Sequence, residues 1–302
     1  MDVSVIFVNY RTSGLIAESI RSIIRHTEGV SYEIIIVDNN SEPEFQSNIQ
    51  NSLSIDKPLD IRYLALPENI GFGRANNKGW EISKGRNIFF LNPDTLLLNN
   101  AIKLLSDFLD RHPKAGACGG NLYGTDLQPA FSFSRILPGL KWELNELLNY
   151  IPQKISFGKD SHFNTSTKTL PVKYITGADL MVKRTVLNIT GGFSSDFFLY
   201  YEETDLCYRI LNVGYKIFNI PEAKIQHLES KSMEESGEFQ SDFKTKYLEK
   251  SRKIYYSRNV GSFRQILSDA IYLAFLKSRA LLIRDKRKKE YYNARIKYFN
   301  DK

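Results

Sequence analysis

Asparagine and aspartate side chains follow four short apolar runs in the N-terminal third of the sequence. The polar segments are Asn9-Tyr10-Arg11, Asp38-Asn39-Asn40-Ser41, Asn69-Ile70-Gly71-Phe72-Gly73-Arg74 and Asn92-Pro93-Asp94. If the runs are strands of an open α/β sheet, these segments meet at its carboxyl edge, where ligands bind. Turns alone also favour Asn, Asp and Gly. Four aligned polar ends favour one shared crevice over four unrelated turns.

Two of these segments suit a nucleotide diphosphate. Asp38 can accept a hydrogen bond from the N3 imide of uracil or thymine. The segment Gly71–Arg74 lets the backbone approach a ligand closely and supplies a cation for phosphate. It is a weak dinucleotide fingerprint, because Asn76 stands at its last position and the segment follows the third apolar run.

Asp94 has the chemistry of a metal ligand. A carboxylate just past a buried strand suits Mg²⁺ or Mn²⁺, which proteins hold with one or two carboxylates plus substrate phosphates. Asp94 could instead cap a helix beginning near Leu98, since Asp is favoured there. His227 follows the apolar run Ala223–Gln226. If that run is a strand, His227 lies on the same side as the four polar segments.

Three acids, Glu202, Glu203 and Asp205, fall within four positions after the run Phe197–Tyr201. One interpretation is favourable placement of negative charge at a helix N-terminus. The other is a carboxylate general base in a partly desolvated pocket, where its pKa rises toward neutrality. Both interpretations stay open on the sequence.

The elements that must position these residues alternate between apolar runs and helical spacing. Strands are predicted at Val3–Val8, Glu33–Val37, Ile61–Ala65, Asn87–Leu91 and Ala115–Gly119, with helices over Leu15–Ile24, Ala75–Ser83 and Leu98–Leu109 and one opened by Pro43. This order predicts an α/β fold with a mostly parallel sheet covered by helices on both faces. The prolines of Thr125–Leu170 indicate an irregular region over one end of the sheet.

Further strands are predicted at Val172–Thr176, Ala178–Lys183 and Lys216–Asn219, and a helix at Asp205–Val213. We expect an α/β domain over 1–230 and a basic helical C-terminal extension over 231–302. The net charge of +7 lies in that extension, because Lys277–Lys302 holds ten basic and three acidic residues. The rest of the chain is electrostatically balanced, so only the extension attracts an anionic surface.

The extension also carries apolar residues at helical spacing, namely Phe263, Ile266, Leu267, Ala270, Ile271, Ala274 and Phe275. No apolar stretch reaches the roughly 20 residues that span a bilayer. The stripe and the basic cluster after it suit peripheral contact with an anionic membrane. Packing on the catalytic domain and formation of a homodimer are the alternatives. We expect no nucleic-acid partner, which would show salt-sensitive duplex binding.

In order and spacing, several segments together resemble the family 2 glycosyltransferases with the GT-A fold, and within them the rhamnosyltransferase-like branch. The matching strings are SVIFVNYRT, IIIVDNNS, ENIGFGRANNKG, FFLNPDTLL, ITGADLMVKR and GGFSSDFFLYYEETDLCYRI, with His227 after them. They lie between Val3 and His227, a stretch of about three quarters of the chain. The resemblance implies an inverting, non-processive transfer of one sugar, with rhamnose favoured, from a UDP- or dTDP-sugar to an acceptor hydroxyl.

The resemblance also implies the site. The metal ligands for Mn²⁺ or Mg²⁺ are Asp94 and His227, and the base is Glu203, with Glu202 or Asp205 as alternatives. The expected donor and acceptor residues are Asn9, Tyr10, Arg11, Asp38, Asn40, Asn69, Gly71, Arg74, Asn92, Thr176, Gly177 and Asp205. The acceptor would be a glycan or a polyprenyl-linked sugar in cell-surface polysaccharide synthesis.

Two residues depart from the family pattern. Asn92 stands where the metal motif begins with Asp, and Glu203 replaces the usual catalytic Asp. These departures keep open a catalytically impaired, sugar-nucleotide-binding or scaffold protein. A nucleotidylyltransferase would need a Gly-rich, Lys-bearing loop after the first strand, where Asn9-Tyr10-Arg11-Thr12 stands instead. The sequence has no Gln-x-x-Arg-Trp motif of processive synthases.

The expected location is cytoplasmic, at the inner face of the plasma membrane. Cys118 and Cys207 are the two cysteines and lie far apart, which favours a reducing compartment. The first residues have the pattern of a core strand rather than of a signal peptide.

Overall fold

The computed structural model describes residues 1–41, 44–53, 59–228 and 241–301. The strands are β1 Val3–Asn9, β2 Tyr32–Asp38, β3 Ile61–Ala65, β4 Asn87–Leu91, β5 Thr95–Leu97, β6 Ala115–Tyr123, β7 Phe133–Ser134, β8 Leu170–Val172, β9 Tyr174–Ile175, β10 Asp179–Lys183 and β11 Lys216–His227. The helices are α1 Ser13–His26, α2 Phe45–Leu53, α3 Phe72–Ile82, α4 Ala101–Arg111, α5 Leu140–Leu147, α6 Ile151–Phe157, α7 Arg184–Thr190, α8 Glu202–Asn212, α10 Ser241–Asn259, α11 Ser262–Leu282 and α12 Lys286–Asn300, with a 3₁₀ turn η1 at Gly158–Ser161.

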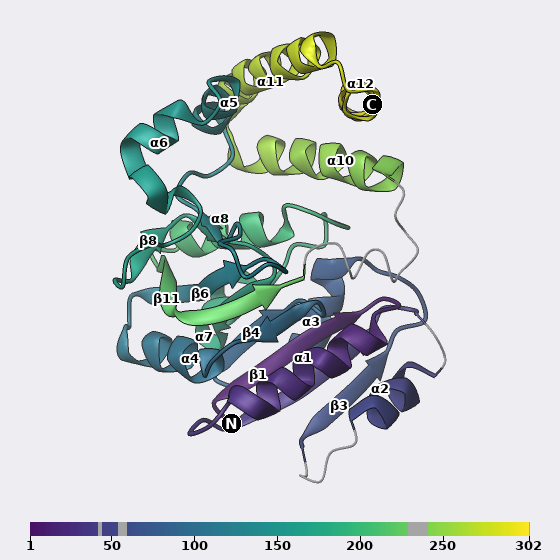
Figure 1. Ribbon diagram of the computed structural model, residues 1–302, viewed down its shortest axis with the longest axis vertical. Helices are drawn as coiled ribbons and strands as arrows, with labels where there is room; N and C mark the ends of the chain where they lie inside the picture. Colours follow the sequence, from purple (N-terminus) through teal and green to yellow (C-terminus); the bar gives the residue numbers. More distant parts are fainter. Residues whose placement is uncertain (42–43, 54–58, 229–240, 302) are drawn as a thin grey trace.

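Nine of the described strands form a mixed sheet in the order β3-β2-β1-β4-β10-β6-β11-β5, with β8 beside β11 (Figure 1), and β7 pairs with β9 separately. The first four strands in this order run parallel, as right-handed crossovers require. β10 enters antiparallel between β4 and β6. The predicted α/β fold is confirmed, and β1, β2, β3, β4 and β6 lie where the apolar runs predicted, whereas the short β5 was not predicted.

Helices cover both faces of the sheet because the strands bury both of their faces. Val5 and Phe7 of β1 pack in the core beneath α1, α2 and α4. Ile6 and Val8, which point the opposite way, pack in the core beneath α3, α7 and α8. The parallel register places Asn9 beside Asp38 at the carboxyl edge.

Several element boundaries differ from the prediction. α4 begins at Ala101 with Asn100 as its N-cap, so Asp94 does not cap this helix. The expectation of an irregular region is wrong for Leu140–Phe157, which forms α5 and α6. Pro152 hid α6 because it occupies the first turn, where the missing N–H costs nothing. The proposed helix start at Pro43 and the 230/231 domain boundary lie outside the described residues.

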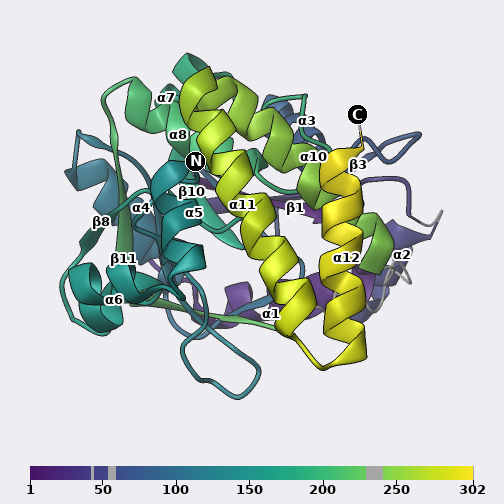
Figure 2. The ribbon, with the colours of Figure 1, turned by 90° about the horizontal axis from the view of Figure 1, so that it is seen from above.

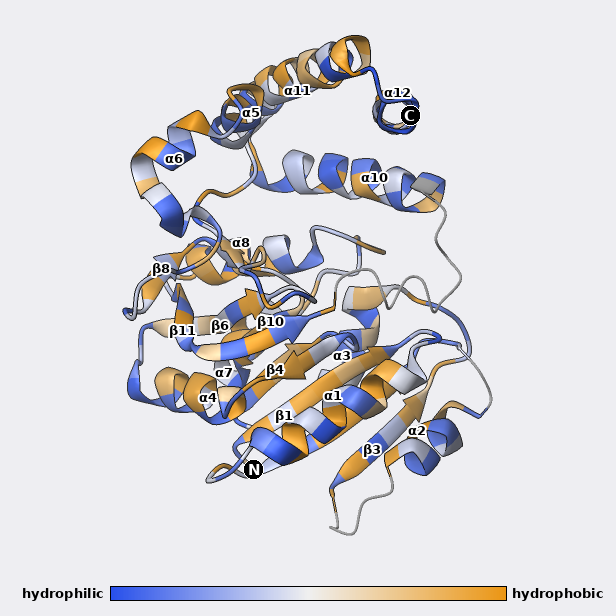
Figure 3. Ribbon diagram, in the orientation of Figure 1, coloured by the Kyte–Doolittle hydropathy of each residue, from blue (hydrophilic) through white to orange (hydrophobic). Residues whose placement is uncertain are grey.

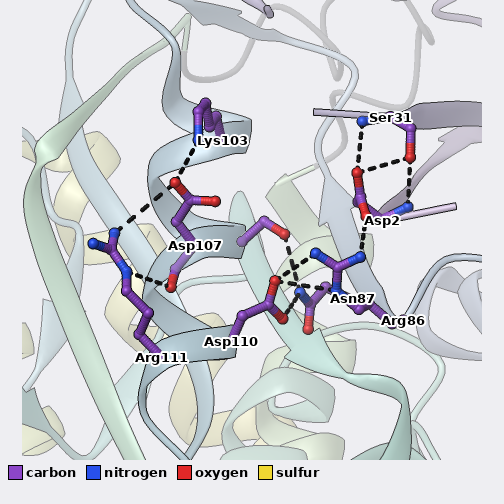
Figure 4. Close-up of polar contacts among 9 residues, drawn as sticks. Asp2, Ser31, Arg86, Asn87, Lys103, Asp107, Asp110 and Arg111 are labelled. Atoms are coloured by element: carbon purple, nitrogen blue, oxygen red, sulfur yellow. Dashed lines mark hydrogen bonds and ion pairs between the residues drawn. The ribbon is translucent and has the colours of Figure 1, made fainter. Parts of the chain in front are cut away.

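A polar cluster lies at the amino edge of the sheet, opposite the carboxyl edge that holds Asn9 and Asp38 (Figure 4). Arg86 forms ion pairs with Asp2 and, at 2.6 Å, with Asp110. Asn87 also donates to Asp110, at 3.0 Å. Hydrogen bonds from the Ser31 backbone and hydroxyl, together with Arg86, lower the pKa of Asp2 to about 2. The cluster ties β1 and β4 to the end of α4.

The C-terminal extension is helical, as predicted, and α11 packs against both α5 and α12 (Figure 2). α10 lies between α8 on one side and α11 and α12 on the other (Figure 1). The buried Arg252 of α10 forms ion pairs with Glu143 of α5, at 2.9 Å, and with Asp269 of α11, at 2.7 Å. In the parts of the chain that the structure describes, no helix has the length and apolarity to cross a membrane.

Candidate active site

A cavity of about 360 Å³ opens at the carboxyl edge of the sheet. The loops after β1, β2, β3 and β4 line it, together with the segment before β10, the start of α8 and the end of β11. The cavity-lining residues that the sequence predicted are Tyr10, Asn69, Gly71, Asn92, Thr176, Gly177, Glu202, Glu203 and His227. The crevice fed by four strand ends is therefore present.

Asn9 and Asp38 form a buried pair beside the cavity rather than in its lining. The Asn9 amide donates to Asp38 Oδ1 at 2.7 Å, and the Ser41 backbone donates to Asp38 Oδ2 at 3.0 Å. Their neighbours Tyr10 and Asn39 line the cavity. The pair thus fixes the two loops that face a ligand.

Gly71 makes a turn that no other residue can make here. Its φ is +89°, and a Cβ atom at this position would lie 2.4 Å from the carbonyl oxygen of Phe198. Asn39 holds the same loop, because its Oδ1 accepts from the Ile70 backbone at 2.9 Å. α3 therefore begins at the cavity, and its N-terminal N–H groups are placed where a helix can bind a phosphate.

Besides Asn9, Asp38 and Asp94, four predicted residues lie outside the cavity lining. Arg74 donates through Nε to the Ser195 carbonyl at 2.8 Å, so its guanidinium serves the fold. Arg11 and Asn40 are exposed. Asp205 is fully buried and accepts from Arg209 at 2.8 Å and from Asn259 at 3.0 Å. Arg209 is four residues along the same helix, whereas Ser195 and Asn259 come from distant segments that sequence patterns do not reveal.

Asp94 and His227 face each other. Oδ1 of Asp94 lies 3.3 Å from Nε2 of His227, and the Asp94 side chain is 2% exposed. Antiparallel pairing of β5 with β11 places His227 opposite Thr95. The Leu228 backbone also donates to the Asp94 carbonyl at 2.8 Å.

This pair fits a divalent cation, because its carboxylate oxygen and imidazole nitrogen are close enough to bind one ion. Among the described residues, no group of three or more His, Cys, Asp or Glu side chains could hold a metal. Further ligands would therefore come from a substrate such as a diphosphate, and from water.

Glu202 and Glu203 begin α8 directly after two residues in the left-handed conformation, Tyr200 and Tyr201, with φ of 69° and 67°. Such strained backbone concentrates at functional sites. Burial raises the pKa of both carboxyls, and the charge of Glu203 raises the pKa of Glu202 further. Two adjacent buried carboxylates do not ionise independently, so Glu202 keeps its proton to higher pH.

The sequence interpretation missed part of the lining. Phe198, Leu199 and Phe243 also line the cavity, and Phe243 belongs to α10. The Phe198 ring stacks on Tyr247 of the same helix, with centroids 4.6 Å apart. The aromatic run before Glu202 was visible in the sequence. Nothing in the basic C-terminal pattern pointed to Phe243.

The antiparallel strand in the middle of a parallel sheet, with a carboxylate–imidazole pair and a raised-pKa carboxylate at its carboxyl edge, defines a glycosyltransferase with the GT-A fold. Residues 4–172 match the family model described as "Glycosyl transferase family 2". The chain belongs to this family, as the sequence motifs predicted.

Curated relatives carry glycosyltransferase names. The chain is 24% identical over 255 residues to the low-salt glycan biosynthesis hexosyltransferase Agl10 of Haloferax volcanii, covering 82% of this chain and 75% of the relative. It is 24% identical over 192 residues to the N-acetylglucosaminyl-diphospho-decaprenol L-rhamnosyltransferase of Mycobacterium tuberculosis, covering 58% of this chain and 61% of the relative. These names support the rhamnosyltransferase-like branch.

A solved structure shares the fold across almost the whole chain. It is the mannosyltransferase PcManGT from Pyrobaculum calidifontis, in complex with GDP-Man and Mn²⁺. The TM-score is 0.57 at 15% sequence identity, over 98% of this chain and 84% of the other. The likeness bears out the GT-A fold.

Proposed function

We propose that the protein is an inverting, non-processive glycosyltransferase of cell-surface polysaccharide synthesis. It moves a sugar, with rhamnose favoured, from a UDP- or dTDP-sugar to the hydroxyl of a glycan or polyprenyl-linked acceptor. The observation that carries the proposal is that one cavity brings two functional groups together. Its lining contains His227, which faces Asp94, and also the Glu202–Glu203 pair. The name of the Mycobacterium tuberculosis relative supports both the sugar and the acceptor class.

Asn39, Asn69 and the start of α3 bind and orient the donor in this proposal. Asp38 and Asn9 fix the loops that receive the pyrimidine base. Asp94 and His227 hold Mn²⁺ or Mg²⁺, which when bound offsets the negative charge of the diphosphate leaving group. Asn92 lines the same part of the cavity and contributes a neutral amide.

Glu203 acts as the base. Its carboxylate takes the proton of the acceptor hydroxyl while that oxygen forms a bond to the anomeric carbon of the donor sugar. The bond from this carbon to the diphosphate oxygen breaks, and its electron pair leaves with the diphosphate. One displacement of this kind inverts the anomeric centre. Glu202 keeps its proton and so leaves Glu203 as the ionised partner of the pair.

In this proposal the protein contacts the cytoplasmic face of the membrane peripherally, where a polyprenyl-linked acceptor would be held. The face of α11 that packs inward consists of Ser268, Tyr272, Leu276 and Ala280, not the predicted apolar stripe. Packing of the stripe on the catalytic domain is therefore excluded for Phe263 and Ile266, which are 74% and 67% exposed. Figure 3 shows apolar residues on α6 and α11 and a largely hydrophilic α12.

The test is transfer and hydrolysis of a panel of UDP- and dTDP-sugars with Mn²⁺, Mg²⁺ or EDTA. The wild-type protein is compared with Asp94→Ala and Glu203→Gln, and donor binding is measured by calorimetry. Metal-dependent turnover of one donor, with an inverted anomeric centre in the product, supports the proposal. Donor binding without turnover on any acceptor would favour the scaffold alternative. Absence of binding to every pyrimidine donor would overturn the donor-site assignment.

A further inference from the structure

Two more cavities continue from the one described above. One of about 160 Å³ is lined by Tyr200 and Glu203, which also line the first cavity. The other, of about 500 Å³, shares Trp142 and Tyr174 with the second. The three cavities therefore form a row in which each shares wall residues with the next. Glu203 lies in the wall shared by the first and second cavities.

Aromatic side chains dominate the walls away from the first cavity. Trp142, Tyr174 and Tyr200 line the second cavity, and Phe131 and Tyr150 join the lining of the third. Polar groups in the third cavity come from Gln153, Lys154, Ser161 and His162. Rigid aromatic faces with a few fixed polar groups are typical of a small-molecule site, and a volume of about 500 Å³ lies within the usual range of roughly 300–1,000 Å³.

The lining is held firmly enough to select a ligand. Gln153 is 1% exposed, and its amide accepts from Asn145 at 2.7 Å and donates to the Ser161 carbonyl at 3.2 Å. Leu248 of α10 closes one wall of the second cavity. The segment Phe131–His162 thus contributes to both cavities, and α10 contributes Leu248 to the second alone.

We propose that the second and third cavities form the acceptor site and that the acceptor is a saccharide of at least two residues. The inference rests on the proposed function. The terminal sugar lies in the second cavity with its hydroxyl at Glu203, and the next sugar lies between the aromatic side chains of the third. A ring hydroxyl reaches the base from the side opposite the donor, as a single displacement requires. The third cavity ends at α6, beside the exposed Ile151 and Ile155.

The two tryptophans of the chain give a direct test. Trp142 lines both cavities, whereas Trp80 lies on α3 and lines none of the three. In Trp80→Phe, the fluorescence of Trp142 alone reports on the acceptor site. In the matched variant Trp142→Phe, Trp80 alone remains. The probes are rhamnose- and N-acetylglucosamine-terminated mono-, di- and trisaccharides, free and as polyprenyl diphosphates.

We expect Trp142 emission to change saturably as a di- or trisaccharide binds and Trp80 emission to show no response. The Kd of that oligosaccharide should be at least tenfold lower than the Kd of its terminal monosaccharide. Trp142→Ala should raise the acceptor KM at least tenfold and leave the donor Kd unchanged. Transfer to a panel saccharide without a Trp142 response would overturn the acceptor site, as would a panel in which no oligosaccharide binds better than its monosaccharide. Loss of donor binding in the wild type would instead count against the proposed function, because acceptor binding is measured without donor.

Discussion

The imidazole Nε2 of His227 lies 3.3 Å from the carboxylate Oδ1 of Asp94. The two residues are far apart in the chain, and pairing of β5 with β11 sets their distance. Because one strand pair carries both groups, a cation between them would be held by rigid elements at the edge of the sheet. Substrate oxygens can complete such a site.

Removing the imidazole tests this arrangement. His227→Ala should weaken Mn²⁺ activation by at least the roughly 10- to 100-fold that loss of an outer-shell partner costs. Asp94→Ala should abolish activation at the same concentrations. Activity against Mn²⁺ concentration, with donor present, measures both effects. His26→Gln, at the end of α1, is the matched control. Unchanged activation in His227→Ala would remove His227 from the metal site.

Replacing the base should affect turnover rather than donor binding. Glu203→Gln should lower kcat by roughly 10²- to 10⁴-fold, the usual contribution of general base catalysis. Because burial raises the pKa of Glu203, wild-type activity should rise with pH through that raised pKa. Glu203→Gln should lose this rise. The measurement is the transfer rate of the wild-type protein and of Glu203→Gln from pH 5 to 9, with the donor Kd as control. A flat wild-type profile would contradict the assignment.

Glu202 should make folding stability depend on pH. Its pKa in the folded protein is raised well above 4.5 by burial, so the folded state binds more protons than the unfolded state. The buried Glu202 therefore lowers the free energy of unfolding as the pH rises. This loss is absent below about pH 4.5 and grows as the pH rises toward the raised pKa. Glu202→Gln should stabilise the protein at pH 8 by more than about 0.5 kcal/mol, and much less at pH 4.

Urea unfolding at the two pH values measures this difference. Glu222→Gln, at an exposed position of β11, should change stability equally little at both. An equal effect of Glu202→Gln at pH 4 and pH 8 would show that the Glu202 carboxyl has no raised pKa in the folded state.

Gly71 should tolerate no side chain, because an added Cβ would meet the Phe198 carbonyl. Gly71→Ala should cost more than the roughly 1–2 kcal/mol of left-handed backbone strain and should weaken donor binding. Gly191→Ala is the control, since its φ is +81° and nothing lies within 4 Å of the added Cβ. Equal losses in stability for the two variants would mean that the close approach to Phe198 has no cost.

The exposed apolar residues should bind anionic membranes. Ile155 of α6 and Leu281 of α11 are 81% and 80% exposed, and Leu281 directly precedes the basic residues around the start of α12 in the sequence. Ile155→Asp and Leu281→Asp should each reduce sedimentation with phosphatidylglycerol vesicles several-fold, and added salt should weaken wild-type binding. Ile189→Asp, on the exposed side of α7, should leave it unchanged. A dimer that dissociates in Leu281→Asp, with vesicle binding intact, would support the homodimer alternative.

Local patterns were sufficient for most of the sheet. The runs from Val3, Tyr32 and Asn87 are strands whose two faces are both buried, and this demands nearly continuous apolar residues. The run from Ile61 is the half-buried edge strand of the sheet. The helices α5 and α6 were missed because each is short and Pro152 lies in the first turn of α6. Short helices take their stability from tertiary packing, here of α5 on α11 and of α6 on η1 and α5, and leave little periodic signal.

The sequence by itself determined which polar residues reach the carboxyl edge, because strand direction and a two-residue side-chain period follow from the chain alone. Only the tertiary structure decided how they are used. Arg74 and Asp205 serve the fold because Ser195 and Asn259, from distant segments, lie within hydrogen-bonding distance of them. Phe243 enters the cavity because α10 packs across the segment before α8. Hydrogen bonds and packing act over a few ångströms, so the partners of a side chain depend on contacts between distant segments that local periodicity does not encode.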